Sequence, residues 1–365
     1  MKLLFFIASL ECGGAERVSA RLCSYWAESG WDVTLATFDD GSAPPFYPLS
    51  TRVRHVTLDL KRRSTSFLHS LANNGKRIRR LRRFVAEEKP DRIVSFIDAT
   101  NVLALIAARG RGIPVVVSER IDPHHHTIPW GWRALRRSVY PWAHTIVVQT
   151  QGAADFFPAA WRARIVVIPN PVPDLPAVAI AAPKRPSIVA MGRLDPQKGF
   201  DLLVDAFASI AASIPEWELT ILGEGPERAS LEARVARGGL AGRVHLPGRV
   251  TDVASVLNGA EIFVLSSRYE GFPNALLEAM AAGLAAVAFD CPSGPREIVR
   301  DGIDGILVPP GDVPALAEAV SSLARDPGRR RALGEKARGV LERFSMPAVA
   351  GMWSRVLDGA GTRES

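Results

Sequence analysis

The sequence predicts an α/β protein made of two doubly wound domains, and three observations support this prediction. The chain has 365 residues and a mass of 39.5 kDa, enough for about two domains that each bury a core. Short apolar runs alternate with helical patterns from end to end, which is typical of parallel sheets covered on both faces. A proline-rich stretch at 170–186 interrupts the alternation and indicates a linker.

The N-terminal domain is predicted over 1–170, and its candidate strands are continuous apolar runs. Such runs are typical of strands buried on both faces of a parallel sheet. The helical pattern between the first two runs ends at Gly30, a residue common at helix C-termini. The candidate strands are 3–8, 32–38, 53–58, 92–97, 114–118, 145–149 and 165–169.

The same alternation resumes after a linker at 171–186 and defines a C-terminal domain over 187–345. Three helical stretches end the chain, and the last segment, 346–365, is expected to pack back toward the N-terminal domain. The candidate strands are 187–192, 218–222, 243–246, 261–266, 285–289 and 305–308, and the final helices are 312–324, 328–342 and 347–358.

Composition excludes several classes of protein. With 47% hydrophobic and 23% charged residues, the chain is an ordinary globular sequence without long disorder. Its three cysteines are too few and too scattered for a disulfide framework or a zinc site, which predicts a reducing, cytoplasmic compartment. Glu11 before Cys12 argues against a lipoprotein signal, and no apolar run approaches the ~20 residues that cross a bilayer.

The positive charge is confined to the N-terminal half. Residues 1–180 hold 24 Lys and Arg against 15 Asp and Glu, whereas the remainder holds 21 against 23. Basic patches of this kind suit nucleic acid, anionic lipid or phosphorylated substrates. Nucleic acid is disfavoured because the clusters lack interleaved aromatic residues. The clusters are 61–63, KRIRRLRR at 76–83, and Arg133, Arg136 and Arg137.

The cluster at 76–83 predicts an amphipathic basic helix. Its apolar residues recur at helical spacing, and six cations fill the remaining arc. We expect the apolar stripe to pack inside the protein and the cations to dock on an anionic membrane, which predicts peripheral association with the inner face of the cell membrane. The stripe consists of Ile78, Leu81, Phe84 and Val85.

Two glycine-containing turns follow predicted strands, the places where open α/β sheets bind ligands. After the first strand, Gly13 and Gly14 allow close backbone approach, and the helix that follows offers free N–H groups to an anion. The GxGxxG fingerprint of dinucleotide-binding proteins is absent. In MGRLDPQKGF, Arg193 and Lys198 can both address one pyrophosphate and so neutralise a leaving group without a metal.

A third motif, EGFPNALLE, places two glutamates eight residues apart. Glu270 lies in a glycine-containing loop, and Glu278 lies in a helix that Pro273 and Asn274 can open, about two turns inside it. One carboxylate can meet a sugar and the other a ribose diol. Taken alone, each of the three motifs also fits an ordinary turn, exposed cations or helix capping.

Five segments in register carry a more specific signal: GGAERV at 13–18, IPNPV at 168–172, GRLDPQKG at 192–199, EGFPNALLEAMAAG at 270–283 and DGIDGILVPPGD at 301–312. Together they resemble the retaining glycosyltransferases of family 4 over nearly the whole chain. SERIDP at 118–123 and DCPSGPREI at 290–298 make the sequence most similar to bacterial enzymes that build surface polysaccharides or lipid-linked oligosaccharides.

The resemblance implies the GT-B fold, in which two doubly wound Rossmann-like domains face a central cleft. It implies a metal-independent, retaining hexosyltransferase without a cofactor. The donor would be a nucleotide-diphosphate sugar carrying a hexose or N-acetylhexosamine, and the acceptor a glycan or a polyprenyl-linked or other lipid-linked molecule. A sugar-nucleotide epimerase of similar architecture is the alternative, but nothing in the sequence matches the acid and base groups that elimination needs.

The resemblance also implies roles for individual residues. Glu270, Arg193 and Lys198 would be catalytic, with the two cations on the donor diphosphate and Glu270 facing the transferred sugar. Glu278 would accept hydrogen bonds from the ribose hydroxyls. The other donor-binding residues would be Gly13, Gly14, Arg249, Val250, Gly271, Phe272, Asn274 and Leu277.

One departure concerns the acceptor side. Many relatives carry a sugar-contacting histidine soon after the strand that matches 114–118, whereas this chain has Glu119 and Arg120. We expect acceptor binding from Glu119, Arg120 and His124, and whether any histidine of the run at 124–126 replaces the missing one stays open. Consecutive side chains rarely converge on one ion, so no metal site is predicted.

Overall fold

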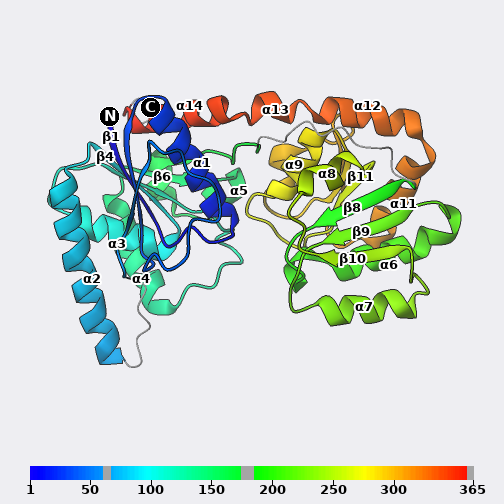
Figure 1. Ribbon diagram of the computed structural model, residues 1–365, viewed down its shortest axis with the longest axis horizontal. Coiled ribbons are helices and arrows are strands. Elements are labelled where there is room, and N and C mark those ends of the chain that lie inside the picture. Colours follow the sequence, from blue (N-terminus) through cyan, green and yellow to red (C-terminus); the bar gives the residue numbers. More distant parts are fainter. Residues whose placement is uncertain (61–66, 174–184, 360–365) are drawn as a thin grey trace. The chain divides into compact units, whose positions relative to one another are not determined.

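The structure, a computed structural model, describes residues 1–60, 67–173 and 185–359, with no side chains described for 67–74. Contacts divide the chain into two units. The N-terminal unit comprises Met1–Pro171 and Met346–Ser365, and the C-terminal unit comprises Val172–Ser345. Each unit is a parallel sheet covered by helices on both faces, so the predicted fold class is confirmed (Figure 1). The cluster at 61–63 and most of the expected linker lie outside the described residues.

The described strands of the N-terminal unit form one parallel sheet in the order β3-β2-β1-β4-β5-β6-β7. The chain therefore runs outward from β1 to β3 and returns to the centre at β4. Leu4 of β1 lies opposite Thr34 of β2 and Ile93 of β4, which fixes the register at the centre. The strands are β1 (Lys2–Ile7), β2 (Asp32–Thr37), β3 (Arg54–Thr57), β4 (Arg92–Phe96), β5 (Val115–Ser118), β6 (Thr145–Val148) and β7 (Ile165–Val167).

Helices α2 (Phe67–Glu88), α3 (Asp98–Ala108) and α4 (Trp130–Val139) contribute to one core cluster of this unit. In α2, Leu81 and Val85 are fully buried, whereas Arg79, Arg80 and Arg83 are exposed. The apolar stripe of the basic helix therefore packs inward, and four of its six cations are exposed, whereas Arg77 and Arg82 are partly buried. The short helix α5 (Gln151–Asp155) follows β6.

The opposite face of the N-terminal sheet packs against α1 (Gly14–Glu28) and α14 (Met346–Leu357), which come from the two ends of the chain. Trp353 of α14 is fully buried. Its ring centroid lies 6.2 Å from that of Trp26 in α1 and 5.7 Å from that of Phe96 in β4. The C-terminal helix thus completes the core of the N-terminal unit.

The C-terminal unit repeats this topology, with its described strands in the order β10-β9-β8-β11-β12-β13. Its order also reverses at the centre, between β8 and β11. Each strand predicted from the sequence is present in one of the two sheets, with bounds within two residues of the prediction. The strands here are β8 (Ser187–Met191), β9 (Glu218–Leu222), β10 (Val244–Gly248), β11 (Ile262–Leu265), β12 (Ala285–Phe289) and β13 (Ile306–Val308).

The helices of this unit supply two core clusters. The single helix predicted at 328–342 is in fact two, because Gly339, a poor helix former, lies between them. The helices are α6 (Phe200–Ile210), α7 (Arg228–Arg237), α8 (Val253–Asn258), α9 (Asn274–Ala282), α10 (Pro295–Ile298), α11 (Val313–Arg325), α12 (Pro327–Ala337) and α13 (Val340–Arg343).

Replacement of Trp353 tests the packing of α14. We expect Trp353→Ala to lower the free energy of unfolding of the N-terminal unit by about 3–5 kcal/mol, because it leaves a cavity between α1 and β4. Denaturant unfolding followed by circular dichroism measures this change. Arg355→Ala, on the exposed side of the same helix, serves as the control. Equal stability of the two variants would contradict the packing.

Candidate active site

Three of the predicted site positions, Lys198, Glu270 and Gly13, follow strands at which a sheet reverses its order. In the C-terminal unit, Lys198 comes after β8 and Glu270 after β11, and these strands are neighbours. In the N-terminal unit, Gly13 comes after β1, next to β4. Ligands of open α/β sheets bind beyond the carboxyl ends of the strands at such reversals. The topology thus gives each unit a position suited to ligand binding.

The Glu270 carboxylate is buried in the C-terminal unit and held by two donors. The residue is 4% exposed. Its Oε1 atom accepts hydrogen bonds from Lys198 Nζ at 2.7 Å and from Ser267 Oγ at 2.5 Å. A buried carboxylate is costly unless it is paired and hydrogen-bonded, and these two donors meet that requirement. The structure thus brings together two of the three predicted catalytic residues.

A glycine and a serine hydrogen bond place Lys198 beside Glu270. The turn after β8 ends at Gly199, which has φ of +61°. A Cβ atom there would lie 2.1 Å from the carbonyl oxygen of Ser266, so glycine is needed for this close approach to the end of β11. Ser266 Oγ in turn donates to the carbonyl oxygen of Lys198 at 2.9 Å. Consecutive serines therefore restrain both partners of the ion pair.

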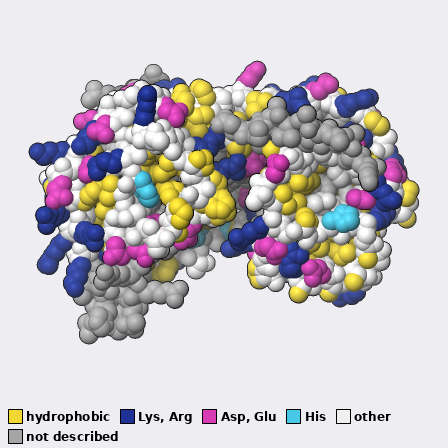
Figure 2. Space-filling view, viewed as in Figure 1, with side chains coloured by type: hydrophobic (Ala, Val, Ile, Leu, Met, Phe, Trp, Pro, Cys, Tyr) yellow, Lys and Arg dark blue, Asp and Glu magenta, His cyan; other side chains and the backbone are white. Residues whose placement is uncertain are grey.

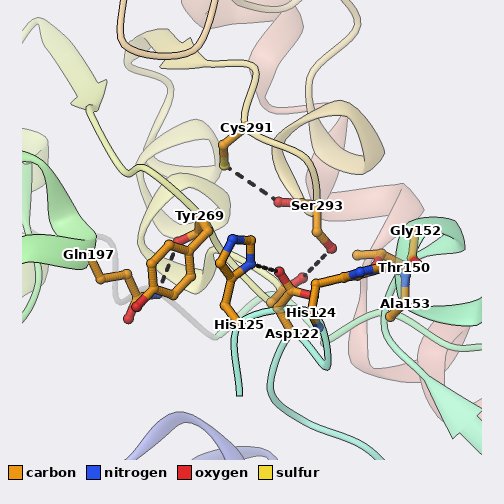
Figure 3. Close-up of polar contacts among 11 residues, drawn as sticks. Asp122, His124, His125, Thr150, Gly152, Ala153, Gln197, Tyr269, Cys291 and Ser293 are labelled. Atoms are coloured by element: carbon orange, nitrogen blue, oxygen red, sulfur yellow. Dashed lines mark hydrogen bonds and ion pairs between the residues drawn. The ribbon is translucent and has the colours of Figure 1, made fainter. Parts of the chain in front are cut away.

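A third bond joins the same two loops: Gln197 Nε2 donates to the carbonyl oxygen of Tyr269 at 3.0 Å (Figure 3). Sequence reasoning missed Ser266, Ser267 and Gln197, because polar residues at strand ends and in turns are common. The sequence signal for Ser267 is its position directly after the apolar run at 261–266 and three residues before Glu270.

Arg193 lies in the same loop as Lys198 but makes a different contact. Its Nε donates to Asp195 Oδ2 at 2.6 Å, and 72% of its side chain is exposed. Its terminal nitrogens have no acceptor among the described residues, and the Asp195 Oδ1 atom is buried without a partner there. Arg193 is therefore held at one nitrogen only and keeps its outer guanidinium group available.

Glu278 lies closer to the start of its helix than the spacing suggested. Helix α9 begins at Asn274, with Pro273 at its N-cap, so Glu278 is little more than one turn inside it rather than two. Glu278 and Phe272 are 6% and 7% exposed, and Leu277 is fully buried. The chain between Glu270 and Pro273 is not helical, so only the residues from Asn274 onward count toward the turns that precede Glu278.

Cys291 lies in the surroundings of Glu270. Its Sγ donates to the carbonyl oxygen of Ser293 at 3.6 Å (Figure 3). Burial, reinforced by the negative charge of Glu270, raises the pKa of the Cys291 thiol to about 12. The thiol is therefore neutral at physiological pH and adds no second negative charge near Glu270.

The remaining donor residues lie at the same edge of the C-terminal sheet or in the N-terminal unit. Arg249 and Val250 follow β10, where Arg249 is exposed and Val250 is partly buried. Gly271 and Asn274 are also partly buried. In the N-terminal unit, Gly13 is the N-cap of α1 and Gly14 its first residue.

Glu119 and Arg120 are turned into the interior of the N-terminal unit. Glu119 Oε1 accepts a hydrogen bond from Tyr140 Oη and one from Arg136 at 3.4 Å. Burial raises the pKa of Glu119, although Arg136 and Tyr140 oppose this shift. Arg120 donates to Asn170 Oδ1, and burial lowers its pKa to about 9. In this structure both side chains are engaged by protein groups.

The histidine run is anchored by a buried aspartate. His125 Nδ1 lies 2.7 Å from Asp122 Oδ2, and the backbone N–H of His124 donates to the other oxygen of Asp122 (Figure 3). His126 Nε2 lies 3.6 Å from Asp98 Oδ2. His124 and His125 are both exposed, and the His124 ring packs edge-on against Phe156. Across residues 1–60, 67–173 and 185–359, no group of three His, Cys, Asp or Glu residues has an arrangement that could hold a metal ion.

Two family descriptions match the sequence. A glycosyl transferase 4-like domain matches residues 13–171, and glycosyl transferases group 1 matches residues 185–326. The chain belongs to the family 4-like glycosyltransferases. The resemblance inferred from the motifs is thereby confirmed, and the enzyme class with it.

Several bacterial glycosyltransferases are similar to this chain over most of its length. One, from Campylobacter jejuni, is an N-acetyl-D-galactosaminyltransferase acting on a GalNAc-containing glycan on diphosphoundecaprenol; it is 27% identical over 98% of both chains. An amylovoran biosynthesis glycosyltransferase of Erwinia amylovora is 28% identical over 84% of this chain and 85% of its own length.

Solved structures share the fold of this glycosyltransferase. Sucrose-phosphate synthase from Thermosynechococcus elongatus superposes with a TM-score of 0.80 at 21% identity, covering 98% of this chain and 99% of its own. HepE of Anabaena, solved with UDP and glucose, has a TM-score of 0.79 at 21% identity over 98% and 99% of the two chains. These similarities establish the GT-B fold.

The interior position of Glu119 leads to a test by unfolding. We expect Glu119→Gln to lower the free energy of unfolding of this glycosyltransferase by about 3 kcal/mol, because it leaves the buried Arg136 guanidinium without an opposite charge. Glu87→Gln breaks the exposed pair with Arg83 and should have no measurable effect. Denaturant unfolding compares the two, and an unchanged midpoint for Glu119→Gln would contradict the buried pair.

Proposed function

We propose that this glycosyltransferase is a metal-independent, retaining enzyme that transfers a hexose or N-acetylhexosamine from a nucleotide-diphosphate sugar to a glycan or lipid-linked acceptor. The observation that carries this proposal is the Lys198–Glu270 pair at the strand reversal of the C-terminal sheet. The Campylobacter relative, named for adding N-acetylgalactosamine to a glycan on diphosphoundecaprenol, supports the sugar and acceptor classes.

Lys198 is placed to neutralise the leaving group. Cleavage of the bond between the sugar and the phosphate leaves negative charge on the nucleoside diphosphate, and a preorganised cation in a partly buried site stabilises that charge strongly. An ammonium group has three N–H donors, so Lys198 can bind a phosphate oxygen and keep its bond to Glu270. The available terminal nitrogens of Arg193 can bind the same diphosphate.

Glu270 is placed to bind the transferred sugar. Its Oε1 atom is occupied by Lys198 and Ser267, whereas Oε2 has no partner among the residues of the described ranges and can accept from a sugar hydroxyl. In the retaining reaction that we propose, the acceptor attacks on the face that the nucleotide leaves, and a diphosphate oxygen takes the acceptor proton. This route needs no protein nucleophile, unlike the two-carboxylate route of most retaining glycosidases.

We also propose that the enzyme docks on an anionic membrane through α2. Arg79 and Arg80 are exposed and have no ion-pair partner in the part of the chain that the structure describes. Basic side chains gather along the flank of the N-terminal unit on which α2 lies (Figures 1 and 2). Each cation near an anionic surface adds about 1 kcal/mol of attraction. Within the described ranges, no helix has the length and apolarity that a membrane span requires.

Substitution of the two cations tests the diphosphate assignment. We expect Lys198→Ala and Arg193→Ala each to lower kcat by roughly a hundredfold, because both lose a donor to charge that grows in the transition state. Steady-state kinetics with the donor measures this, and Lys336→Ala, an exposed lysine on α12, is the control. Arg193 is largely exposed, so Arg193→Ala should keep the melting temperature. Wild-type turnover in both folded variants would reject the assignment.

The two glutamates should affect different kinetic constants. We expect Glu270→Ala mainly to lower kcat, because contacts to the reacting sugar change between ground and transition states. Glu278→Ala should mainly raise the donor KM, because contacts to the ribose are the same in both states. Initial rates over a range of donor concentrations separate the two constants. If both variants changed KM alone, these roles would be wrong.

A further inference from the structure

Helix α4 exposes an unusual set of apolar side chains. Trp130, at its first residue, is 78% exposed, and Leu135 is 38% exposed. Trp142, just beyond the helix, is 40% exposed. Large apolar groups left in water on one helix commonly mark a contact surface. Tryptophan in particular favours the interface between lipid and water, where its ring is buried and its N–H stays wet.

The arginines of α4 divide between the two sides of the helix. Arg136 is buried and bonds to Glu119. Arg133 and Arg137 are exposed and have no ion-pair partner among the residues described. Exposed Arg109, at the end of α3, holds its guanidinium 4.4 Å from the centre of the Trp142 ring. The outer side of α4 therefore combines exposed apolar side chains with arginines that have no ion-pair partner in the described ranges.

This surface is connected to the basic face of α2 through α3. Helix α3 packs against both α2 and α4, and all three contribute to the same core cluster (Figure 1). Arg82 of α2 donates to the carbonyl oxygens of Ile106 and Arg109, which ties the end of α3 to α2. The exposed sides of α2 and α4 thus flank one helix within a single unit.

We propose that the exposed side of α4 is an interfacial membrane anchor. Trp130 and Leu135 insert at the boundary between headgroups and acyl chains, and Arg133 and Arg137 bind lipid phosphates. The inference rests on the proposed docking by α2 and adds an apolar component to it. A glycan stacked on Trp130 or a second copy of the chain would also cover the ring, but the unpaired arginines beside it favour a surface rich in phosphate.

The two components differ in their response to salt. Attraction between the α2 cations and anionic lipid is screened as ionic strength rises. Burial of Trp130 and Leu135 is apolar and is not screened in this way. Binding by both helices therefore predicts a fraction that salt removes and a fraction that remains.

Vesicle co-sedimentation of the full chain separates these fractions. Vesicles of phosphatidylcholine with and without phosphatidylglycerol are compared at low and high salt. We expect Trp130→Ala with Leu135→Ala to reduce the salt-resistant partition by about tenfold, because two apolar side chains no longer transfer. Arg79→Ala with Arg80→Ala should reduce the salt-sensitive fraction, of which Arg133 and Arg137 supply the rest, and leave the salt-resistant fraction unchanged. Phe46→Ala, which removes another exposed aromatic side chain of the same unit, is the control.

Each outcome decides a separate claim. Unchanged high-salt binding of the α4 variant, with its melting temperature preserved, overturns the anchor. Unchanged binding of the α2 variant removes the proposed docking by charge, and neither result bears on glycosyl transfer to a soluble acceptor.

Two further outcomes would assign the α4 surface to another occupant. A raised KM of the α4 variant for a soluble glycan acceptor, with normal vesicle binding, assigns Trp130 to glycan stacking instead. A wild-type oligomer that dissociates in the α4 variant, with normal vesicle binding, assigns the surface to a second copy.

Discussion

A carboxylate removed from water needs hydrogen bonds and an opposite charge, and in the C-terminal unit Glu270 imposes this requirement. Lys198 and Ser267 meet it at one oxygen atom. Their placement depends in turn on Gly199, whose missing Cβ lets the loop after β8 approach Ser266 at the end of β11. The chemistry proposed for this enzyme therefore follows from the need to hold one buried charge at the point where the sheet reverses.

The two units use the same topology but distribute charge differently. In the C-terminal unit, Lys198 and Glu270 lie at the strand reversal, with Arg193 more exposed beside them. In the N-terminal unit, Glu119 and Arg120, which follow β5, are engaged internally, and exposed arginines without an ion-pair partner among the described residues lie on the outer sides of α2 and α4. The proposed division of labour is consistent with this contrast: donor chemistry in one unit, and acceptor and membrane recognition in the other.

The strands and the inward stripe of α2 could be predicted because continuous apolar runs and helical periodicity report burial directly. The Lys198–Glu270 contact could be anticipated only as two separate motifs, since it spans 72 residues and depends on which strands are neighbours. Glu278 was expected too deep in its helix because the eight-residue spacing counts from Glu270, whereas the helix starts at Asn274, where the sequence places its opening. The exposure of Trp130 could not be foreseen, because an aromatic residue in a helical pattern usually indicates core.

The central claim is that the pair formed by Lys198 and Glu270 binds a nucleotide-diphosphate sugar without a metal. Thermal unfolding with a panel of nucleotide sugars, in the presence of EDTA, tests it most directly. The account predicts that at least one of these donors raises the melting temperature of the wild type and that the shift is lost in Lys198→Ala. A panel without any stabilising donor, or a shift that EDTA abolishes, would contradict it.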